Sequence, residues 1–279
     1  MKVERRNLAE LTTLAVGGPA EVWTVESPED LARAASAPYR VMGNGSNLLV
    51  ADGGVPERVI RLGGVFAQGS VGRPRPGEAT HLTPWIGAGT LLPSLVQEAA
   101  RLGLSGLEPL LGIPASVGGA VRMNAGTRFG EIADVLEAVE LFHEGRFRVL
   151  DPSELGFGYR TSRLPGGAIV TRVRLRLVPA PAAAIEARMA EVDAARKGQP
   201  KRKSAGCAFK NPPGDAAGRL VDAAGFKGLR VGAAMVSREH GNFIVNTGGA
   251  RAKDVWKLVK RIQEELGLEL EWEVWGELP

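Results

Sequence analysis

The chain has 279 residues, of which 44% are hydrophobic and 24% charged, and its formal net charge is +4. This composition is typical of a folded protein with two or three small domains, and it excludes long disorder. No apolar run approaches the roughly 18 residues that a membrane helix needs, and the first residues lack the apolar core of a signal peptide. We therefore expect a soluble, cytoplasmic protein without a membrane partner.

Cysteine and histidine are scarce. Cys207 is the one cysteine, so an internal disulfide is excluded. The three histidines, His81, His143 and His240, lie far apart and form no metal-ligand spacing with one another or with Cys207. The sequence therefore predicts no zinc site.

The N-terminal part alternates short predicted elements with loops. A helix is expected to begin at Pro28, because Ser27 is a good cap and proline is favoured at the first helical position. A strand at 39–42 then leads into a glycine-rich loop at 43–47. Another strand is predicted at 59–62.

The middle of the chain continues this pattern. Residues 73–78 indicate a loop or domain connection, and a strand at 85–88 precedes a helix at 91–102, with Thr90 as its cap. Strands are predicted near 135–142 and 168–178. The second of these alternates apolar and arginine side chains and ends at a Pro-Ala-Pro sequence, which is a candidate boundary.

The C-terminal part begins with an alanine-rich helix at 183–195 and a basic run at 196–203. A helix with an apolar face is predicted at 255–266, and Gly267 ends it. The last strand, 268–274, carries glutamates on one side. Because strands and helices mix without a regular βαβ repeat, the sequence predicts an α+β fold.

The basic run Arg196–Lys203 has two interpretations. Such clusters are usually exposed and solvated, although they can also bind nucleic acid. No aromatic residue interleaves with the run, which argues against single-strand binding. The small net charge suits a pocket for an anionic small molecule at least as well as a nucleic-acid surface.

Two glycine-rich loops are candidates for binding a dinucleotide. In the first, at 43–47, closely spaced glycines expose backbone N–H groups and Asn and Ser add donors, although a tight hairpin turn is an equal alternative. The second, at 111–120 and continuing to 126, is long and weakly charged, and its alternative is a buried turn between core elements. Two such loops without a Walker motif favour a dinucleotide cofactor.

Seven sequence blocks, two of which contain these loops, occur in the same order as in a known protein family. The chain resembles the UDP-N-acetylenolpyruvoylglucosamine reductase (UDP-N-acetylmuramate dehydrogenase) family, in the form without a tyrosine-loop insertion. The blocks are Thr12–Thr13 with Val16–Ala20, Gly43–Leu49, Gly112–Pro114 with Gly118–Ala120 and Met123–Gly126, Tyr159–Ser162, Ser204–Pro212, His240–Asn246 and Glu271–Val274.

The resemblance implies a flavoprotein of the vanillyl-alcohol-oxidase and p-cresol-methylhydroxylase type. It implies an FAD-binding region in two parts, 1–64 and 65–179, and a substrate-binding domain at 180–267, and we expect the strand at 268–279 to return to the first part. It also implies NADPH-dependent reduction of UDP-N-acetylglucosamine-enolpyruvate to UDP-N-acetylmuramate in peptidoglycan synthesis. FAD would be non-covalent, NADPH would be the hydride donor, and the protein would be a monomer without nucleic-acid or membrane partners.

The resemblance also implies a role for particular residues. Its catalytic residues are Arg160, Cys207 and Glu273. Its substrate-binding residues are Tyr159, Arg163, Lys210, Asn211 and His240. Its FAD-binding residues are Gly43, Asn44, Gly45, Ser46, Asn47, Leu48, Gly112, Ile113, Pro114, Ser116, Val117, Gly118, Gly119, Asn124, Ala125 and Gly126.

The implied chemistry explains the three catalytic candidates. Hydride addition to the enolpyruvyl alkene moves negative charge onto its carboxylate, which Arg160 would bind with two hydrogen bonds. Glu273 would lie beside the same carboxylate. Cys207 would donate the proton, because an ordinary thiol, with a pKa of about 8.5, is largely protonated at neutral pH.

Each candidate also has a simpler interpretation, and the chain departs from the family pattern in places. Arg160 is otherwise a surface arginine, Glu273 a solvated glutamate and Cys207 a small core residue. Cys207 stands where the family usually has serine, and Trp275 stands where it commonly has arginine. Ala115 also replaces a frequent glycine, and Gly241 a more common alanine.

Two other functions remain alternatives. The first is an FAD-dependent sugar or alcohol oxidase of the same fold. Such enzymes often attach flavin through a histidine near the glycine loops, and neither loop contains one. The second is a nucleic-acid-binding protein that uses residues 196–203, which predicts strongly salt-dependent binding and no yellow colour.

Overall fold

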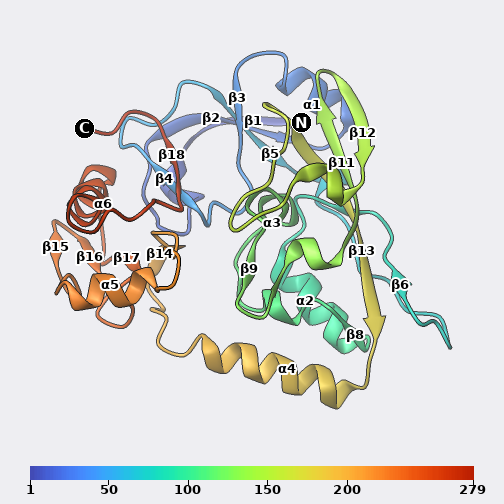
Figure 1. Cartoon of the computed structure of the whole chain (residues 1–279). Helices are drawn as coiled ribbons and strands as arrows, with labels where there is room; N and C mark the ends of the chain where they lie inside the picture. Colours follow the sequence, from blue (N-terminus) through green and yellow to red (C-terminus); the bar gives the residue numbers. More distant parts are fainter. The chain divides into compact units, whose positions relative to one another are not determined.

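The computed structural model describes residues 1–279, the whole chain, and its contacts group them into two compact units (Figure 1). Unit 1 comprises 1–2, 23–43 and 60–197, and unit 2 comprises 3–22, 44–59 and 198–279. These units do not follow the expected boundaries at 64 and 179, because two N-terminal segments group with the C-terminal residues. The three-part functional division stays a prediction. None of the helices is both long and apolar enough to span a membrane.

The main sheet of unit 1 has the strand order β12-β11-β13-β6, and its neighbouring strands are antiparallel. β7 and β8 also pair with β13. Along β13, Val173, Leu175 and Leu177 are buried, and the arginines between them are less so, as their alternation predicts. The strands are β6 (His81–Leu82), β7 (Ile86–Gly87), β8 (Leu104–Ser105), β11 (Leu136–His143), β12 (Arg146–Leu150) and β13 (Ile169–Pro179).

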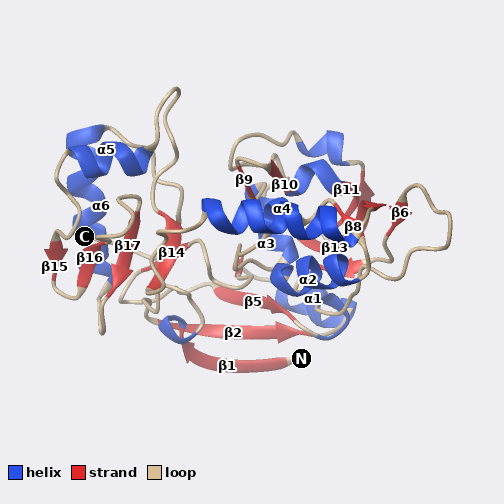
Figure 2. Cartoon of the chain, turned by 90° about the horizontal axis from the view of Figure 1, so that it is seen from below, coloured by secondary structure: helices blue, strands red, loops and turns tan.

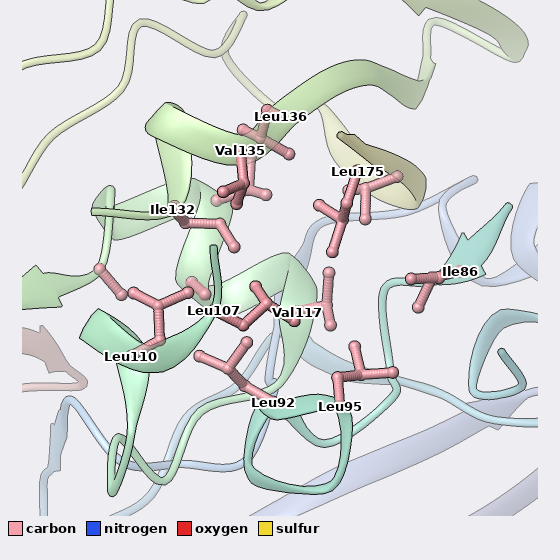
Figure 3. Close-up of a cluster of buried hydrophobic side chains, with 14 of the residues drawn as sticks. Ile86, Leu92, Leu95, Leu107, Leu110, Val117, Ile132, Val135, Leu136 and Leu175 are labelled. Carbon is pink, nitrogen blue, oxygen red and sulfur yellow. The ribbon is translucent and has the colours of Figure 1, made fainter. Parts of the chain in front are cut away.

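The core of unit 1 gathers apolar side chains from its helices and this sheet (Figure 3). Leu92 and Leu95 come from one helix and Val117 from another, and all three are at most 1% exposed. The helices are α2 (Leu92–Arg101), α3 (Val117–Met123) and α4 (Ala182–Ala195), with the 3-10 helices η2 (Gly64–Phe66), η3 (Glu108–Leu110), η4 (Ile132–Val135) and η5 (Pro152–Leu155). Two short strands, β9 (Gly126–Thr127) and β10 (Gly130–Glu131), pair with each other.

A further sheet has the order β1-β2-β5-β3. α1 (Pro28–Ala34) begins as predicted, since Ser27 Oγ accepts a hydrogen bond from the Asp30 N–H at 3.3 Å. Its Leu31 and Ala34 are fully buried. The strands are β1 (Lys2–Asn7), β2 (Pro19–Val25), β3 (Tyr39–Val41) and β5 (Arg58–Leu62), and η1 (Leu8–Glu10) follows β1.

Unit 2 contains an antiparallel sheet of order β14-β17-β16-β15, against which α6 (Ala252–Leu266) packs. Val255, Leu258, Val259 and Ile262 on the apolar face of α6 are fully buried, and Leu266 is partly buried. Gly267 ends the helix with a φ of 63°, as predicted. A separate parallel pair joins β4 (Leu48–Val50) to β18 (Glu273–Trp275). The remaining elements are β14 (Lys203–Cys207), β15 (Arg230–Val231), β16 (Ala234–Val236), β17 (Phe243–Asn246) and α5 (Ala217–Ala223).

Two predictions about element ends are wrong. Leu91, not Thr90, is the N-cap residue of α2, and the Thr90 hydroxyl is buried without a hydrogen-bond partner. The last strand is shorter than 268–274, because regular pairing covers only β18. The residues before β18 alternate because Leu268 and Trp272 are buried. Their backbone at 269–271 bonds to residues 208–210 instead of continuing the pairing of β18.

Candidate functional site

The two glycine-rich loops meet within unit 1. A Cβ at Gly43 would collide with Ser116 Oγ, and Gly119 lies next to the same point. Glycine at 43 is therefore required by the approach of the second loop. The first loop is not a hairpin turn, because β3 and β4 on its two sides belong to different sheets.

The second loop passes from the surface into the core at its junction with α3. Gly112 and Pro114 are exposed, whereas Ala115, Ser116 and Val117 are buried. Ser116 caps α3, since its Oγ accepts from the Gly119 N–H at 3.3 Å. The alternative of a wholly buried turn is therefore wrong for the exposed first half of the loop.

The loop rests on the segment before α2. The N–H of Val117 donates to the Thr90 carbonyl at 2.9 Å, and the N–H of Gly118 to Ala88 at 2.7 Å. The unpaired Thr90 hydroxyl therefore belongs to the residue that supports this loop. A buried hydroxyl without a partner is uncommon, and this one is available to a water molecule or a ligand. Sequence reasoning missed this residue, because it read Thr90 only as a helix cap.

Asn44–Leu48 form the part of the first loop that lies in unit 2. Gly45 has a φ of 63°, and a Cβ there would lie 2.9 Å from Thr12 Cα. The Gly45 carbonyl accepts from the Thr13 N–H at 3.0 Å. Asn47 Nδ2 donates to the Glu271 carbonyl at 3.2 Å, which ties the loop to the chain before β18.

Arg160 lies at the tip of a tight turn in unit 1. Gly158 and Thr161 pair across this turn with N–O distances of 3.1 and 3.2 Å. Arg160 has a φ of 55°, a left-handed conformation that is uncommon for arginine and is often found at functional sites. Its Nη2 donates to the Gly126 carbonyl at 2.6 Å, and its Cζ lies 5.0 Å from the centre of the Tyr159 ring.

Asn124 connects this turn to the end of α3. It is fully buried with a φ of 42°, and its Nδ2 donates to the Gly158 carbonyl at 3.0 Å. Its Oδ1 accepts from the Ala133 N–H at 3.3 Å. The side chain therefore positions the turn that carries Arg160, a role that the predicted FAD contact did not include. In the sequence, only the position of Asn124 in the Met123–Gly126 block marked it as a site residue.

Cys207 follows an irregularity in β14, in unit 2. The pairing of β14 with β17 shifts register between Ser204 and Cys207, and Gly206 has a φ of 75°. Such bulges re-aim side chains and are common beside active sites. Cys207 is half-buried, so it is not the fully enclosed core cysteine of the simpler interpretation.

Glu273 begins β18, and its N–H donates to the Asn47 carbonyl at 3.0 Å. It is half-buried rather than fully solvated. Trp275, which occupies the position of a common arginine, donates from Nε1 to Glu273 Oε2 at 3.4 Å. The substitution therefore leaves the carboxylate with a neutral donor beside it.

The chain before Glu273 also contacts the segment after Cys207. The Ala208 carbonyl accepts from the Glu271 N–H at 2.8 Å, and the Lys210 N–H donates to the Glu269 carbonyl at 2.9 Å. Asn242 fastens the same segment, since its amide donates to the Phe209 carbonyl and accepts from the Phe209 N–H, both at 2.8 Å. Within unit 2, the segment after Cys207 therefore pairs with the segment before Glu273.

The predicted substrate-binding residues occupy different environments. Lys210 Nζ pairs with Glu269 Oε1 at 2.6 Å, and Asn211 Oδ1 accepts from the Ala217 N–H at the start of α5. Burial, with a smaller effect of Lys227, lowers the pKa of His240. Arg163 is exposed in unit 1, where its aliphatic part covers Gly156.

The site residues divide between the two units. Unit 1 contains Gly43, the second glycine-rich loop, Tyr159, Arg160 and Arg163, and unit 2 contains Asn44–Leu48, Cys207, Lys210, Asn211, His240 and Glu273.

Comparisons with known proteins cover both units. A family model described as "FAD binding domain" matches residues 18–146, and one described as "UDP-N-acetylenolpyruvoylglucosamine reductase, C-terminal domain" matches residues 199–275. A protein named UDP-N-acetylenolpyruvoylglucosamine reductase from Thermus thermophilus is 71% identical over 275 residues, covering 99% of this chain and 100% of that protein.

A more distant relative and a solved structure have the same enzyme name. The protein of the same name from Deinococcus radiodurans is 53% identical over 281 residues, covering 99% of this chain and 97% of the relative. The crystal structure of UDP-N-acetylenolpyruvylglucosamine reductase from Thermus caldophilus is 70% identical, with a TM-score of 0.94, and the match covers 99% of this chain and 100% of that one.

Proposed function

The chain belongs to the UDP-N-acetylenolpyruvoylglucosamine reductase family, and from this we propose that it reduces the enolpyruvyl group of UDP-N-acetylglucosamine-enolpyruvate to give UDP-N-acetylmuramate. The observation that carries the proposal is the 71% identity to a relative of that name over 99% of the chain. The predicted family resemblance and the α+β, FAD-binding fold class are confirmed.

Several wider properties are part of this proposal. The enzyme takes its reducing equivalents from NADPH and acts in peptidoglycan precursor synthesis, in the cytoplasm and as a monomer, without nucleic-acid or membrane partners. The small net charge supports the absence of a nucleic-acid partner, and the side chains Lys197, Lys201, Arg202 and Lys203 are exposed, as expected of a solvated run.

The glycine-rich loops fit FAD. Gly43 lies against the Ser116 side chain and next to Gly119, which brings the two loops together. Glycine residues let a backbone approach a diphosphate closely, and the unpaired Thr90 hydroxyl is a polar group on the residue that supports the second loop. The loops would therefore hold the cofactor. When bound, FAD accepts hydride equivalents from NADPH and delivers them to the substrate alkene.

Arg160 would bind the substrate carboxylate. Its contacts with Gly126 and Tyr159 hold the guanidinium in one place before substrate arrives. A fixed cation stabilises developing negative charge without having to reorganise. Glu273 would lie at the same carboxylate, with the Trp275 indole N–H beside it as a neutral donor.

Cys207 would protonate the carbon next to that carboxylate. Its thiol hydrogen is transferred to this carbon, and the electron pair of the S–H bond stays on sulfur as thiolate. The thiolate then regains a proton from solvent. The bulge at Gly206 and the half-buried position of the side chain support this role.

Lys210 would contact the substrate diphosphate. We expect Lys210→Ala to raise the substrate KM about ten-fold, because a charge-assisted hydrogen bond contributes about 1.5–3 kcal/mol. Glu269→Gln removes the ion-pair partner at 2.6 Å and leaves the lysine, so it should not raise KM. Steady-state kinetics of both variants checks this. An equal rise in both would contradict diphosphate binding and leave Lys210 a structural role.

The proposed activity can be tested by following flavin absorbance. The purified protein is reduced anaerobically with NADPH, and UDP-N-acetylglucosamine-enolpyruvate is then added. Return of the oxidised spectrum, with UDP-N-acetylmuramate as product, is the expected result. A flavin that stays reduced would exclude this acceptor and favour the oxidase alternative. Failure to bind FAD after attempted reconstitution would overturn the proposal.

A further inference from the structure

The first residue of the basic run, Arg196, does not behave like the rest of it. The later charged residues are exposed, whereas Arg196 is half-buried and its Nη2 donates to the Gly112 carbonyl at 2.9 Å. A Cβ placed on Gly112 would lie 2.7 Å from Arg196 Nε and 3.0 Å from Cζ. The guanidinium therefore lies directly against the glycine backbone.

Gly112 belongs to the exposed first half of the second glycine-rich loop. Further along the loop, Ala115, Val117 and Gly118 are hydrogen-bonded to residues 88–92. Gly112 itself is exposed, and its φ of 77° is left-handed. The N–H groups of its neighbours Leu111 and Ile113 bond locally to the Glu108 and Leu110 carbonyls. Glycine loses more conformational freedom on ordering than any other residue, so the Arg196 contact adds a restraint on Gly112 from outside the loop.

Helix α4 can provide that contact because it is itself firmly held. It packs against α2 (Figure 2) and against η3, and Ile185 and Val192 are buried. Arg188 of the helix makes a further contact, a cation–π interaction in which its Cζ lies 5.0 Å from the centre of the Phe129 ring. Arg196 is the C-cap residue of α4, where a positive charge also complements the helix dipole.

We propose that Arg196 is a positioning residue that holds the Gly112 end of the glycine-rich loop in the conformation that binds FAD. This rests on the proposed function, in which the loop at 112–119 holds that cofactor. Arg196 acts through the Gly112 backbone, so the contact is a hydrogen bond and a packing surface within unit 1. The first residue of the basic run then supports the loop that holds the cofactor, and the later basic residues are solvated.

The test is the FAD affinity of deflavinated protein, measured by quenching of flavin fluorescence. Arg196→Ala should weaken binding about three- to ten-fold, from the loss of one charge-assisted but partly solvated hydrogen bond. Arg196→Lys should recover part of it, since lysine can donate to the carbonyl but lacks the flat guanidinium. Lys197→Ala, which removes the same charge from an exposed neighbour, should bind FAD as the parent does.

Two further measurements separate positioning from other roles. A positioning residue weakens FAD binding equally at low and high salt, whereas a direct phosphate contact gives a loss that shrinks with salt and would overturn the proposal. The visible circular dichroism of bound flavin should also change in Arg196→Ala. The melting temperature of the deflavinated protein should fall only slightly, because one hydrogen bond and one helix-dipole contact are lost. A lowered melting temperature with unchanged flavin dichroism would assign Arg196 to folding alone.

The outcomes also distinguish this inference from the proposed function. Unchanged FAD affinity and dichroism in Arg196→Ala would overturn the positioning role and leave the reductase proposal intact. A parent protein that binds no FAD would overturn both.

Discussion

Replacing Cys207 by alanine should lower turnover about 10³-fold, within the roughly 10²–10⁴-fold range for general acid catalysis. Cys207→Ala leaves the carbon next to the carboxylate without its proton source. Reduction of the bound flavin by NADPH does not use this proton and should continue at the parent rate. Stopped-flow absorbance separates the two half-reactions: reduction should be normal, and reoxidation by the enolpyruvyl substrate should be slow.

Cys207→Ser is the matched control, because it restores a hydroxyl of similar size and the family's usual residue. It should recover most of the turnover that alanine loses. Gly206, with a φ of 75°, and the bulge before Cys207 are unchanged in both variants, so the backbone should keep its course. Reoxidation of Cys207→Ala at the parent rate would show that another group supplies the proton.

Replacing Arg160 by alanine should lower kcat by about 10²–10³-fold, a typical effect of removing one fixed donor to a developing oxyanion. The effect should fall on reoxidation by substrate, because Arg160 binds the carboxylate whose charge grows in that step. Arg160→Lys should recover only part of the lost kcat, since lysine keeps the charge but cannot make the bidentate hydrogen bond to the carboxylate.

Arg148→Ala is a suitable control for Arg160. Arg148 is an exposed arginine of β12 in the same unit, so it matches the charge change at a surface position. It should have parental kinetics. Because the φ of Arg160 is 55°, alanine at this position keeps an unfavourable backbone conformation. The melting temperatures of Arg160→Ala and the parent protein are therefore compared, to show that the variant is folded. Near-parental reoxidation in a folded Arg160→Ala would exclude the carboxylate-binding role.

The sequence determined the local structure well where the signal lies within a few residues. The Ser27–Pro28 start of α1 and the Gly267 end of α6 were predictable because caps and left-handed glycines are local effects. The ordered family blocks also pointed to the glycine-rich loops and the three catalytic candidates. Such blocks carry positional information that composition and periodicity lack.

Local signals failed where a distant partner decides the structure. Thr90 looked like a helix cap, yet Leu91 takes that position while the Thr90 carbonyl supports Val117 of the glycine-rich loop. The last strand looked regular through residues 268–274, but the backbone at 269–271 bonds to residues 208–210 rather than to β4. In both places, partners far along the chain overrode the local preference.

The sequence by itself therefore determined the family, the α+β class and which residues to consider. Only the tertiary structure showed that Gly43 meets Ser116, that Asn124 holds the Arg160 turn, and that Arg196 lies against Gly112. These contacts join residues 34 to 84 positions apart in the chain. Their geometry arises from the packing of whole elements, so no short window of sequence contains it.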